Sequence, residues 1–163
     1  MAGMKALLLW LADRLASEKF EITREWSRLP YLTRWTLLGR RNEGTGRAVF
    51  LHRFRRSDAD ELHDHPWPFV SIILAGGYHE VTPAPGWAGG SGPTRRRWYG
   101  PGSVLRRPAR WIHRVEIPDG AEAWTLILRG RKERSWGFWW PSVGFVPWRV
   151  HLANAEATGR GCG

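Results

Sequence analysis

The stretch HDHPWPFVSIILAGG, residues 63–77, decides the fold of this chain. It has two histidines at its start, an apolar run in its middle and a glycine pair at its end, a pattern that predicts a strand finishing in a turn. Successive side chains on a strand point to opposite faces, so we expect His63 and His65 to share one face and Asp64 to take the other. Neutral imidazole binds zinc, copper, iron and nickel, so the two histidines indicate a metal site.

The sequence on both sides of this stretch predicts more short strands separated by turns. The expected strands are 31–38, 47–54, 78–81, 96–99, 103–106, 111–117 and 123–128, with 135–140 and 148–152 closing the sheet. Residues 41–46 predict a hairpin connection, and residues 82–94, with three prolines and four glycines, predict an exposed loop. Many short strands without a second helical block indicate an all-β sandwich or barrel.

Only the beginning of the chain has helical periodicity. Met4, Leu8, Leu11 and Leu15 recur at the spacing of an amphipathic helix, which we expect over residues 3–17. A helix that covers one face or edge of the barrel is the simplest interpretation. The apolar run is too short to span a membrane and lacks a small-residue cleavage site, so we expect no membrane association and a cytoplasmic protein.

The length of 163 residues fits one domain with a substantial core. We divide the chain into an N-terminal helix and lead-in (1–30), a β-barrel (31–152) and a flexible C-terminal tail (153–163). The single cysteine, Cys162, lies in that tail, so no internal disulfide is possible and a reducing compartment is expected.

The net charge of +10 arises from 25 Lys and Arg against 15 Asp and Glu. Such a balance is compatible with a nucleic-acid partner or an anionic substrate. The arginines are spread along the chain rather than gathered in one segment. We therefore favour a solvated basic surface over nucleic-acid binding, which stays open as a second interpretation.

A second stretch, GSVLRRPARWIH at residues 102–113, supplies a third histidine. Gly102, Pro108 and His113 match the pattern Gly-x5-Pro-x-Gly-x2-His, and the stretch 63–77 matches a His-x-His motif that ends in a glycine turn. The paired motifs resemble those of the cupins, over residues 63–128. The resemblance implies a double-stranded β-helix, or jelly roll, with the N-terminal helix packed outside it.

The chain departs from the cupin pattern at three positions. The acidic residue of the first motif falls at Phe69 or Val70, the second-motif glycine is Arg110, and the asparagine after the histidine is Ile117. What remains is a set of three histidines, which resembles the iron site of the thiol dioxygenases in this superfamily. Three neutral ligands leave a divalent ion doubly positive, which favours an anionic substrate or a bound thiolate.

Several residues around the histidines are candidates for contact with a substrate. The two-residue period of the strand places Trp67 and Phe69 on the histidine face, where they either floor a substrate pocket or pack as core. Arg53 and Arg97 are candidates to bind a substrate carboxylate in a bidentate contact, the alternative being ordinary surface arginines.

Two residues of the strand after the glycine turn are catalytic candidates. Tyr78 and Glu80 share one face of this strand. Either residue is a candidate proton donor, and Glu80 is also a candidate replacement for the missing carboxylate ligand.

The resemblance and the three histidines together favour a non-heme Fe(II) oxygenase acting on a small, anionic molecule. Zinc, nickel and manganese are alternative metals. A metal-dependent isomerase, lyase or hydrolase on the same fold is the first alternative function. A non-catalytic module that binds a ligand or a nucleic acid is the second. Pairing through the open side of the sheet predicts a homodimer.

Overall fold

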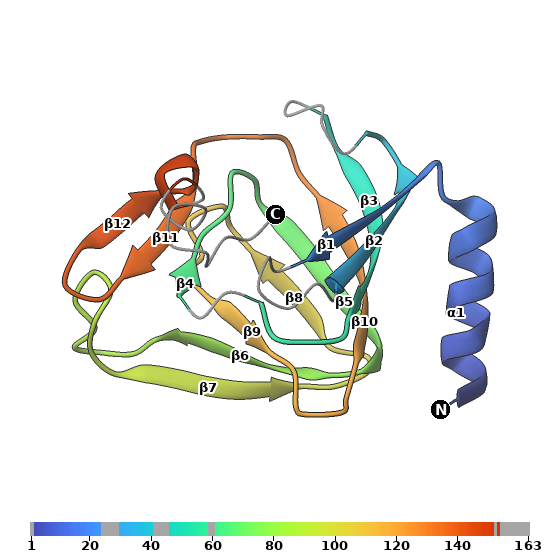
Figure 1. Cartoon of the computed structure of the whole chain (residues 1–163), viewed down its shortest axis with the longest axis horizontal. Coiled ribbons are helices and arrows are strands. Elements are labelled where there is room, and N and C mark those ends of the chain that lie inside the picture. The colour runs from blue at the N-terminus through green and yellow to red at the C-terminus, as the bar shows by residue number, and fades with distance from the viewer. Residues whose placement is uncertain (1, 24–29, 41–45, 59–60, 152, 154–163) are drawn as a thin grey trace.

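The computed structural model describes residues 2–23, 30–40, 46–58, 61–151 and 153 (Figure 1). One helix, α1 (Ala2–Leu15), precedes the strands. The strands of the described residues are β1 (Glu18–Thr23), β2 (Pro30–Leu38), β3 (Ala48–Phe54), β4 (Leu62–His63), β5 (Phe69–Gly76), β6 (Tyr78–Pro83), β7 (Thr94–Tyr99), β8 (Val104–Arg107), β9 (Arg114–Glu116), β10 (Ala123–Arg129), β11 (Gly137–Trp140) and β12 (Gly144–Pro147).

These strands form three antiparallel sheets, so the prediction of an all-β fold with one N-terminal helix is confirmed. The largest sheet has six strands in the order β1-β2-β3-β10-β5-β8. The two smaller sheets have the orders β12-β11-β4 and β7-β6-β9. Neighbours such as β3 and β10 are far apart in the sequence, which is typical of a barrel or sandwich closed by long-range pairing.

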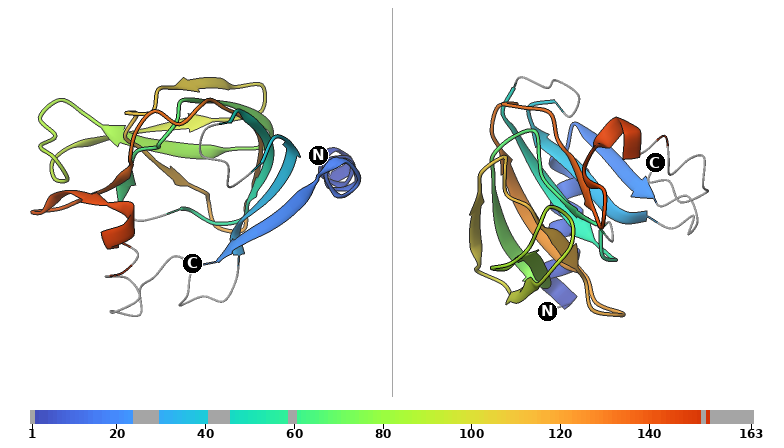
Figure 2. Two further views of the ribbon diagram at one scale, coloured as in Figure 1. Left: turned by 90° about the horizontal axis from the view of Figure 1, so that it is seen from above. Right: turned by 90° about the vertical axis from the view of Figure 1, so that its left-hand side faces the viewer.

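Helix α1 packs against the outer face of the six-stranded sheet, as the views in Figure 1 and Figure 2 show. Ala12 is buried there against Trp35 and Trp124, whose rings stack with centroids 5.6 Å apart. The indole N–H of Trp35 donates a hydrogen bond of 2.8 Å to Asp13. The helix therefore covers one barrel face, as its apolar periodicity predicts. No helix among the described residues has the length and apolarity to cross a lipid bilayer.

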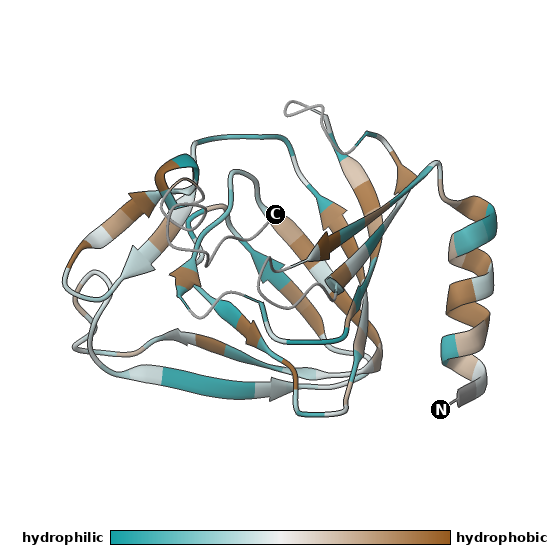
Figure 3. Cartoon of the chain, viewed as in Figure 1, coloured by the Kyte–Doolittle hydropathy of each residue, from teal (hydrophilic) through white to brown (hydrophobic). Residues whose placement is uncertain are grey.

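The barrel interior is built by strand alternation. In β5 half-buried and buried positions alternate from Val70 onward, and Ile73 packs with Tyr78, Leu105 and Val115 in one buried cluster. Apolar segments lie on α1, on strands of the large sheet and also on β12, whereas the middle of β7 is hydrophilic (Figure 3). The two-residue alternation of a pleated strand thus directs every second side chain into the space between the sheets.

The stretch 63–77 forms two strands rather than the single strand predicted for it. β4 belongs to a three-stranded sheet and β5 to the six-stranded sheet, so the chain changes sheet between them. Pro66 and Pro68 lie at this crossing and have no N–H to donate to a ladder. Their carbonyl groups instead accept hydrogen bonds from the backbone of a later loop, including one of 2.8 Å from Gly130 to Pro68.

Three other predictions need correction or completion. Strand β1 was not predicted, although it pairs along its length with β2. Strand β12 was also missed. The strand predicted for 148–152 is wrong, because residues 148–151 are helical. The predicted hairpin connection at 41–46 and tail at 153–163 lie outside the described residues, apart from one residue in each.

Candidate metal centre

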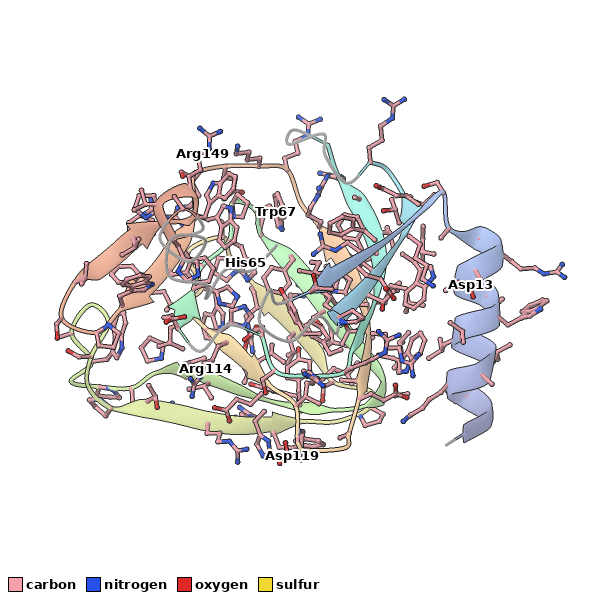
Figure 4. The ribbon with its side chains drawn as sticks, in the orientation of Figure 1. Asp13, His65, Trp67, Arg114, Asp119 and Arg149 are labelled. Carbon is pink, nitrogen blue, oxygen red and sulfur yellow. The ribbon has the colours of Figure 1, made fainter. Side chains whose placement is uncertain are left out.

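His63, His65 and His113 meet at one point in the barrel interior. Their ligating nitrogens all lie within 4.8 Å of one another, and Nε2 of His65 lies 2.8 Å from Nε2 of His113. The backbones of His63 and His113 exchange two hydrogen bonds of 2.9 Å, which hold the two motifs side by side. Figure 4 shows His65 between the sheets, far from the surface residues Asp13 and Asp119.

Asp64 takes the opposite side of the chain from the two histidines, as predicted, although β4 ends at His63 and Asp64 and His65 lie just beyond it. Its Oδ1 accepts a hydrogen bond of 3.0 Å from the amide of Gly137, and its Oδ2 pairs with Arg134. This buried carboxylate therefore ties the crossing between β4 and β5 to β11. It fixes the backbone between the two histidines and does not face the metal centre.

His63 and His65 are held in the neutral form that metal binding requires. Burial, followed by the proximity of His113, lowers the pKa of His63 to about 3. The same causes, with His63 as a further neighbour, lower the pKa of His65 well below its usual value. At neutral pH both rings are unprotonated bases with a free lone pair. Nδ1 of His63 faces the carbonyl oxygen of Glu61 at 3.4 Å, which leaves Nε2 toward the centre.

Glu80 lies behind His113 rather than among the three ligating nitrogens. Its Oε1 is 2.8 Å from Nδ1 of His113, and Trp111 donates its indole N–H to the same oxygen over 3.1 Å. Arg107 holds the carboxylate through Nε, at 2.9 Å, and through Nη2. Burial on its own raises the pKa of Glu80, but the hydrogen bonds from His113 and Arg107 bring it down to about 2.

An ionised Glu80 accepts the Nδ1 proton of His113, so Nε2 of that ring carries the lone pair. Carboxylates in this position behind a ligating histidine fix its tautomer and its orientation. From the sequence, Glu80 is a candidate ligand or proton donor. The structure places it at the back of a histidine, with each oxygen already hydrogen-bonded.

A cavity of about 110 Å³ opens beside the three histidines. Its lining comes from both the large sheet and the smaller sheets: Arg34, Phe50, His52, Phe54, Asp58, His63, His65, Trp67, Phe69, Ser71, Tyr78, His113, Val115 and Ile127. The candidates Trp67, Phe69 and Tyr78 are thus brought to the histidines. Arg53 and Arg97 are not: Arg53 pairs with Glu122, and Arg97 lies over the ring of Tyr99 on an exposed strand.

Arg34 and His52 also line this cavity, and no motif in the sequence connects the two residues. They face each other across β2 and β3, and Nε of Arg34 donates a hydrogen bond of 2.9 Å to Nε2 of His52. Burial, and then the charge of Arg34, lower the pKa of His52 well below its usual value. Arg34 places a permanent positive charge in the cavity wall. Finding it requires the register of β2 against β3, which the sequence does not reveal.

Tyr78 adds a protonated hydroxyl to the same wall. Its oxygen lies 3.5 Å from Oγ of Ser71. Burial raises the pKa of Tyr78 to about 12, the Ser71 contact opposing this shift. The phenol is therefore a neutral donor at physiological pH and faces the space next to the histidines.

The donor set fits a divalent transition metal. When two ligand atoms each lie about 2.1 Å from one metal ion, they are about 3 Å apart in adjacent coordination positions and about 4.2 Å apart in opposite positions. The 2.8 Å between Nε2 of His65 and Nε2 of His113 is a hydrogen-bond distance and is also close to the first of these separations. The three nitrogens spread over up to 4.8 Å, so they have to draw together slightly around an ion. Three imidazole donors facing a cavity also leave coordination positions for a small molecule, which is the arrangement of catalytic rather than structural sites.

Neither a scan of protein-family models nor a search of curated proteins finds a match to this sequence. Solved structures do match. A cupin-2 domain protein from Rhodospirillum rubrum has a TM-score of 0.51 and 15% identity, covering 87% of this chain and 84% of its own. The DMSP lyase DddQ from Ruegeria pomeroyi has a TM-score of 0.51 and 22% identity, covering 83% and 66%.

A third similar structure is Fe(II)-HppE with an alternative substrate. Its TM-score is 0.50 and its identity 10%, covering 69% of this chain and 55% of its own. At these identities the likeness concerns the fold. Together with the β-sheet topology and the three clustered histidines, it shows that this chain has the cupin fold.

Proposed function

We propose that the protein is a metal-dependent enzyme acting on a small anionic molecule, and that its reaction is an Fe(II)-dependent oxygenation. The observation that carries the proposal is the cluster of three histidine nitrogens, from two buried rings and one half-buried ring, that line one cavity. Fe(II) in such a site supplies adjacent positions for a substrate and for oxygen. The fold match to Fe(II)-HppE agrees with this choice of metal.

The size of the cavity restricts the substrate. A cavity of about 150 Å³ accommodates benzene, and the space beside the histidines is about 110 Å³. A substrate enclosed there has on the order of six non-hydrogen atoms, unless part of it extends toward solvent. Small carboxylates, amino acids and thiols meet this limit.

The charge of the cavity favours an anion. Arg34 is a permanent cation in the wall, and the neutral histidines do not balance the charge of a bound divalent ion. Aromatic rings such as Phe50 and Trp67 form much of the remaining lining and exclude water. Exclusion of water strengthens the attraction between the anion and these positive groups.

The first experiment is elemental analysis of protein purified without a histidine tag, beside His63→Ala and His113→Ala variants. We expect near-stoichiometric iron in the wild type and its loss in both variants. Oxygen uptake is then measured with a panel of thiols, amino acids and small carboxylates. Background uptake with iron loaded and the whole panel tested would count against the oxygenase. Salt-sensitive oligonucleotide binding that survives both variants would indicate a binding module instead.

A metal-dependent lyase or isomerase is the second candidate, because Tyr78 places a protonated hydroxyl in the cavity. Such a reaction moves a proton at the substrate and needs an acid or base within reach of it. Here the activity persists without oxygen, and Tyr78→Phe lowers kcat by a factor of about 100 or more. Oxygen dependence with an active Tyr78→Phe variant would exclude this candidate.

A further inference from the structure

We infer that Asp58 supplies a fourth, carboxylate ligand to the metal of the three-histidine centre. The inference rests on the proposed function and adds a residue that neither motif contains. At the position where the cupin pattern expects its acid, the ring of Phe69 faces the cavity and lies 4.9 Å from the ring of His65. Asp58 reaches the centre from the segment that precedes β4.

The position of the Asp58 carboxylate suits a shared ion better than a direct contact. Its Oδ2 lies 3.8 Å from Nε2 of His63, beyond the range of a hydrogen bond. Among the described residues, the ligand atoms within 4.8 Å of one another are those of the three histidines, so the Asp58 carboxylate has to move inward from its place beside His63 to share their ion. Asp58 is 8% exposed and lines the same cavity as the three histidines.

Hydrogen bonds with the backbone of Val115 place Asp58 beside His63. Its amide donates a hydrogen bond of 3.1 Å to the carbonyl of Val115, and the amide of Val115 donates one of 2.9 Å to Oδ1. The amide of Ile117 also donates to Oγ of Ser57 over 3.0 Å. Because Oδ1 is engaged by Val115, Oδ2 is the oxygen directed at His63. Val115 follows His113 by two residues, so one segment positions both Asp58 and His113.

A carboxylate ligand changes the chemistry expected of the site. Three histidines leave a divalent ion with two positive charges, and Asp58 reduces them to one. Oxygen donors also raise the preference for iron and manganese relative to metals that favour nitrogen and sulfur alone. The centre then has the same ligand types, three histidines and one carboxylate, as the full cupin pattern, but the carboxylate comes from a different segment of the chain.

The test compares Asp58→Asn with the wild type by calorimetric titration of metal-free protein with Mn²⁺ and Zn²⁺. The amide keeps an oxygen acceptor for Val115 and removes the charge, so the metal-free melting temperature should change little. We expect Kd for Mn²⁺ to rise at least tenfold. Asp119→Asn is the matched control and should leave Kd unchanged, because Asp119 lies on an exposed turn and does not line the cavity.

The absorption of bound Co²⁺ provides a readout independent of affinity. Loss of a ligand alters the intensity and position of the visible bands, so Asp58→Asn should change the spectrum and Asp119→Asn should not. Wild-type Kd together with a wild-type Co²⁺ spectrum in Asp58→Asn would overturn the inference and leave Asp58 as a structural tie to Val115. A wild-type protein that binds neither ion would overturn the proposed function as well.

Discussion

Nδ1 of His113 lies 2.8 Å from Oε1 of Glu80, and Arg107 grips the same carboxylate with two nitrogens. The histidine is thereby held in one tautomer and one orientation before any ligand binds. Buried networks of this kind are costly to leave half satisfied, because each group has lost its contact with water. The metal centre therefore depends on residues that do not themselves contact the metal.

Replacement of Glu80 by Gln should weaken metal binding by about 10- to 100-fold, because the amide has one acceptor oxygen where the carboxylate has two and does not balance the charge of Arg107. Titration calorimetry of metal-free protein measures the effect. Glu116→Gln is the control, because Glu116 pairs with Arg96 and Arg114 outside the cavity. Equal metal affinity in the wild type and in Glu80→Gln would show that His113 needs no such partner.

Removal of the metal should lower the melting temperature. A ligand present at 100 times its Kd stabilises the native state by about 2.7 kcal/mol. For a chain of this size, such a change corresponds to a shift of about 5–10 °C. Scanning fluorimetry with and without chelator measures it, with elemental analysis to show that the metal has left. An unchanged melting curve after verified removal would mean that the metal does not stabilise the fold.

The metal-free protein should lose stability as the pH falls below 6.5. The pKa of His63 is about 3 in the folded state and 6.5 as a free group, so between these values the unfolded chain binds the additional proton. Each such histidine contributes a slope of about 1.4 kcal/mol per pH unit in this window. Urea denaturation at several pH values from 7 to 5 measures the slope.

His52→Gln should lower the slope of stability against pH by the contribution of one histidine, because the lowered pKa of His52 adds to the same effect. His52 lies outside the three-histidine cluster, so the substitution leaves the three candidate ligands in place. A free energy of unfolding that stays constant from pH 7 to 5 would contradict the lowered pKa values of these histidines.

Arg34→Met should raise KM for an anionic substrate at least tenfold while leaving metal affinity unchanged, since it removes a cation from the cavity wall. Arg97→Met is the matched control, because Arg97 lies on the exposed strand β7. Steady-state kinetics on the substrate found in the oxygen-uptake panel distinguish the two variants. Similar KM values in both would show that the substrate does not contact Arg34.

Asp13→Ala should destabilise the fold by about 1–3 kcal/mol, because the buried indole N–H of Trp35 loses its acceptor. Asp13→Asn retains an acceptor oxygen and should lose less. Denaturant unfolding gives both values. Metal affinity is expected to stay at the wild-type level in both variants, because α1 lies outside the barrel. A loss of bound metal together with the loss of stability would mean that the helix influences the geometry of the metal centre.

The sequence by itself determined the class of fold and the three histidines that meet at the candidate metal centre. Period-two alternation, glycine turns and prolines predict short antiparallel strands, and local spacing puts His63 and His65 on one face with Asp64 on the other. His113 could be added because a second motif was recognisable. All of these are local patterns, which depend on backbone geometry over a few residues.

Tertiary structure decided everything that depends on register and on the closing of one sheet over another. Arg34 reaches the cavity because it pairs with His52 across two strands, and Glu80 reaches the back of His113 because β6 pairs with β9. Asp58 is placed by hydrogen bonds to a strand 57 residues away. A one-residue shift in any of these pairings would turn the side chain to the opposite face. Such long-range pairings leave no periodic signal in the sequence, so these surroundings of the centre emerge only from the folded chain.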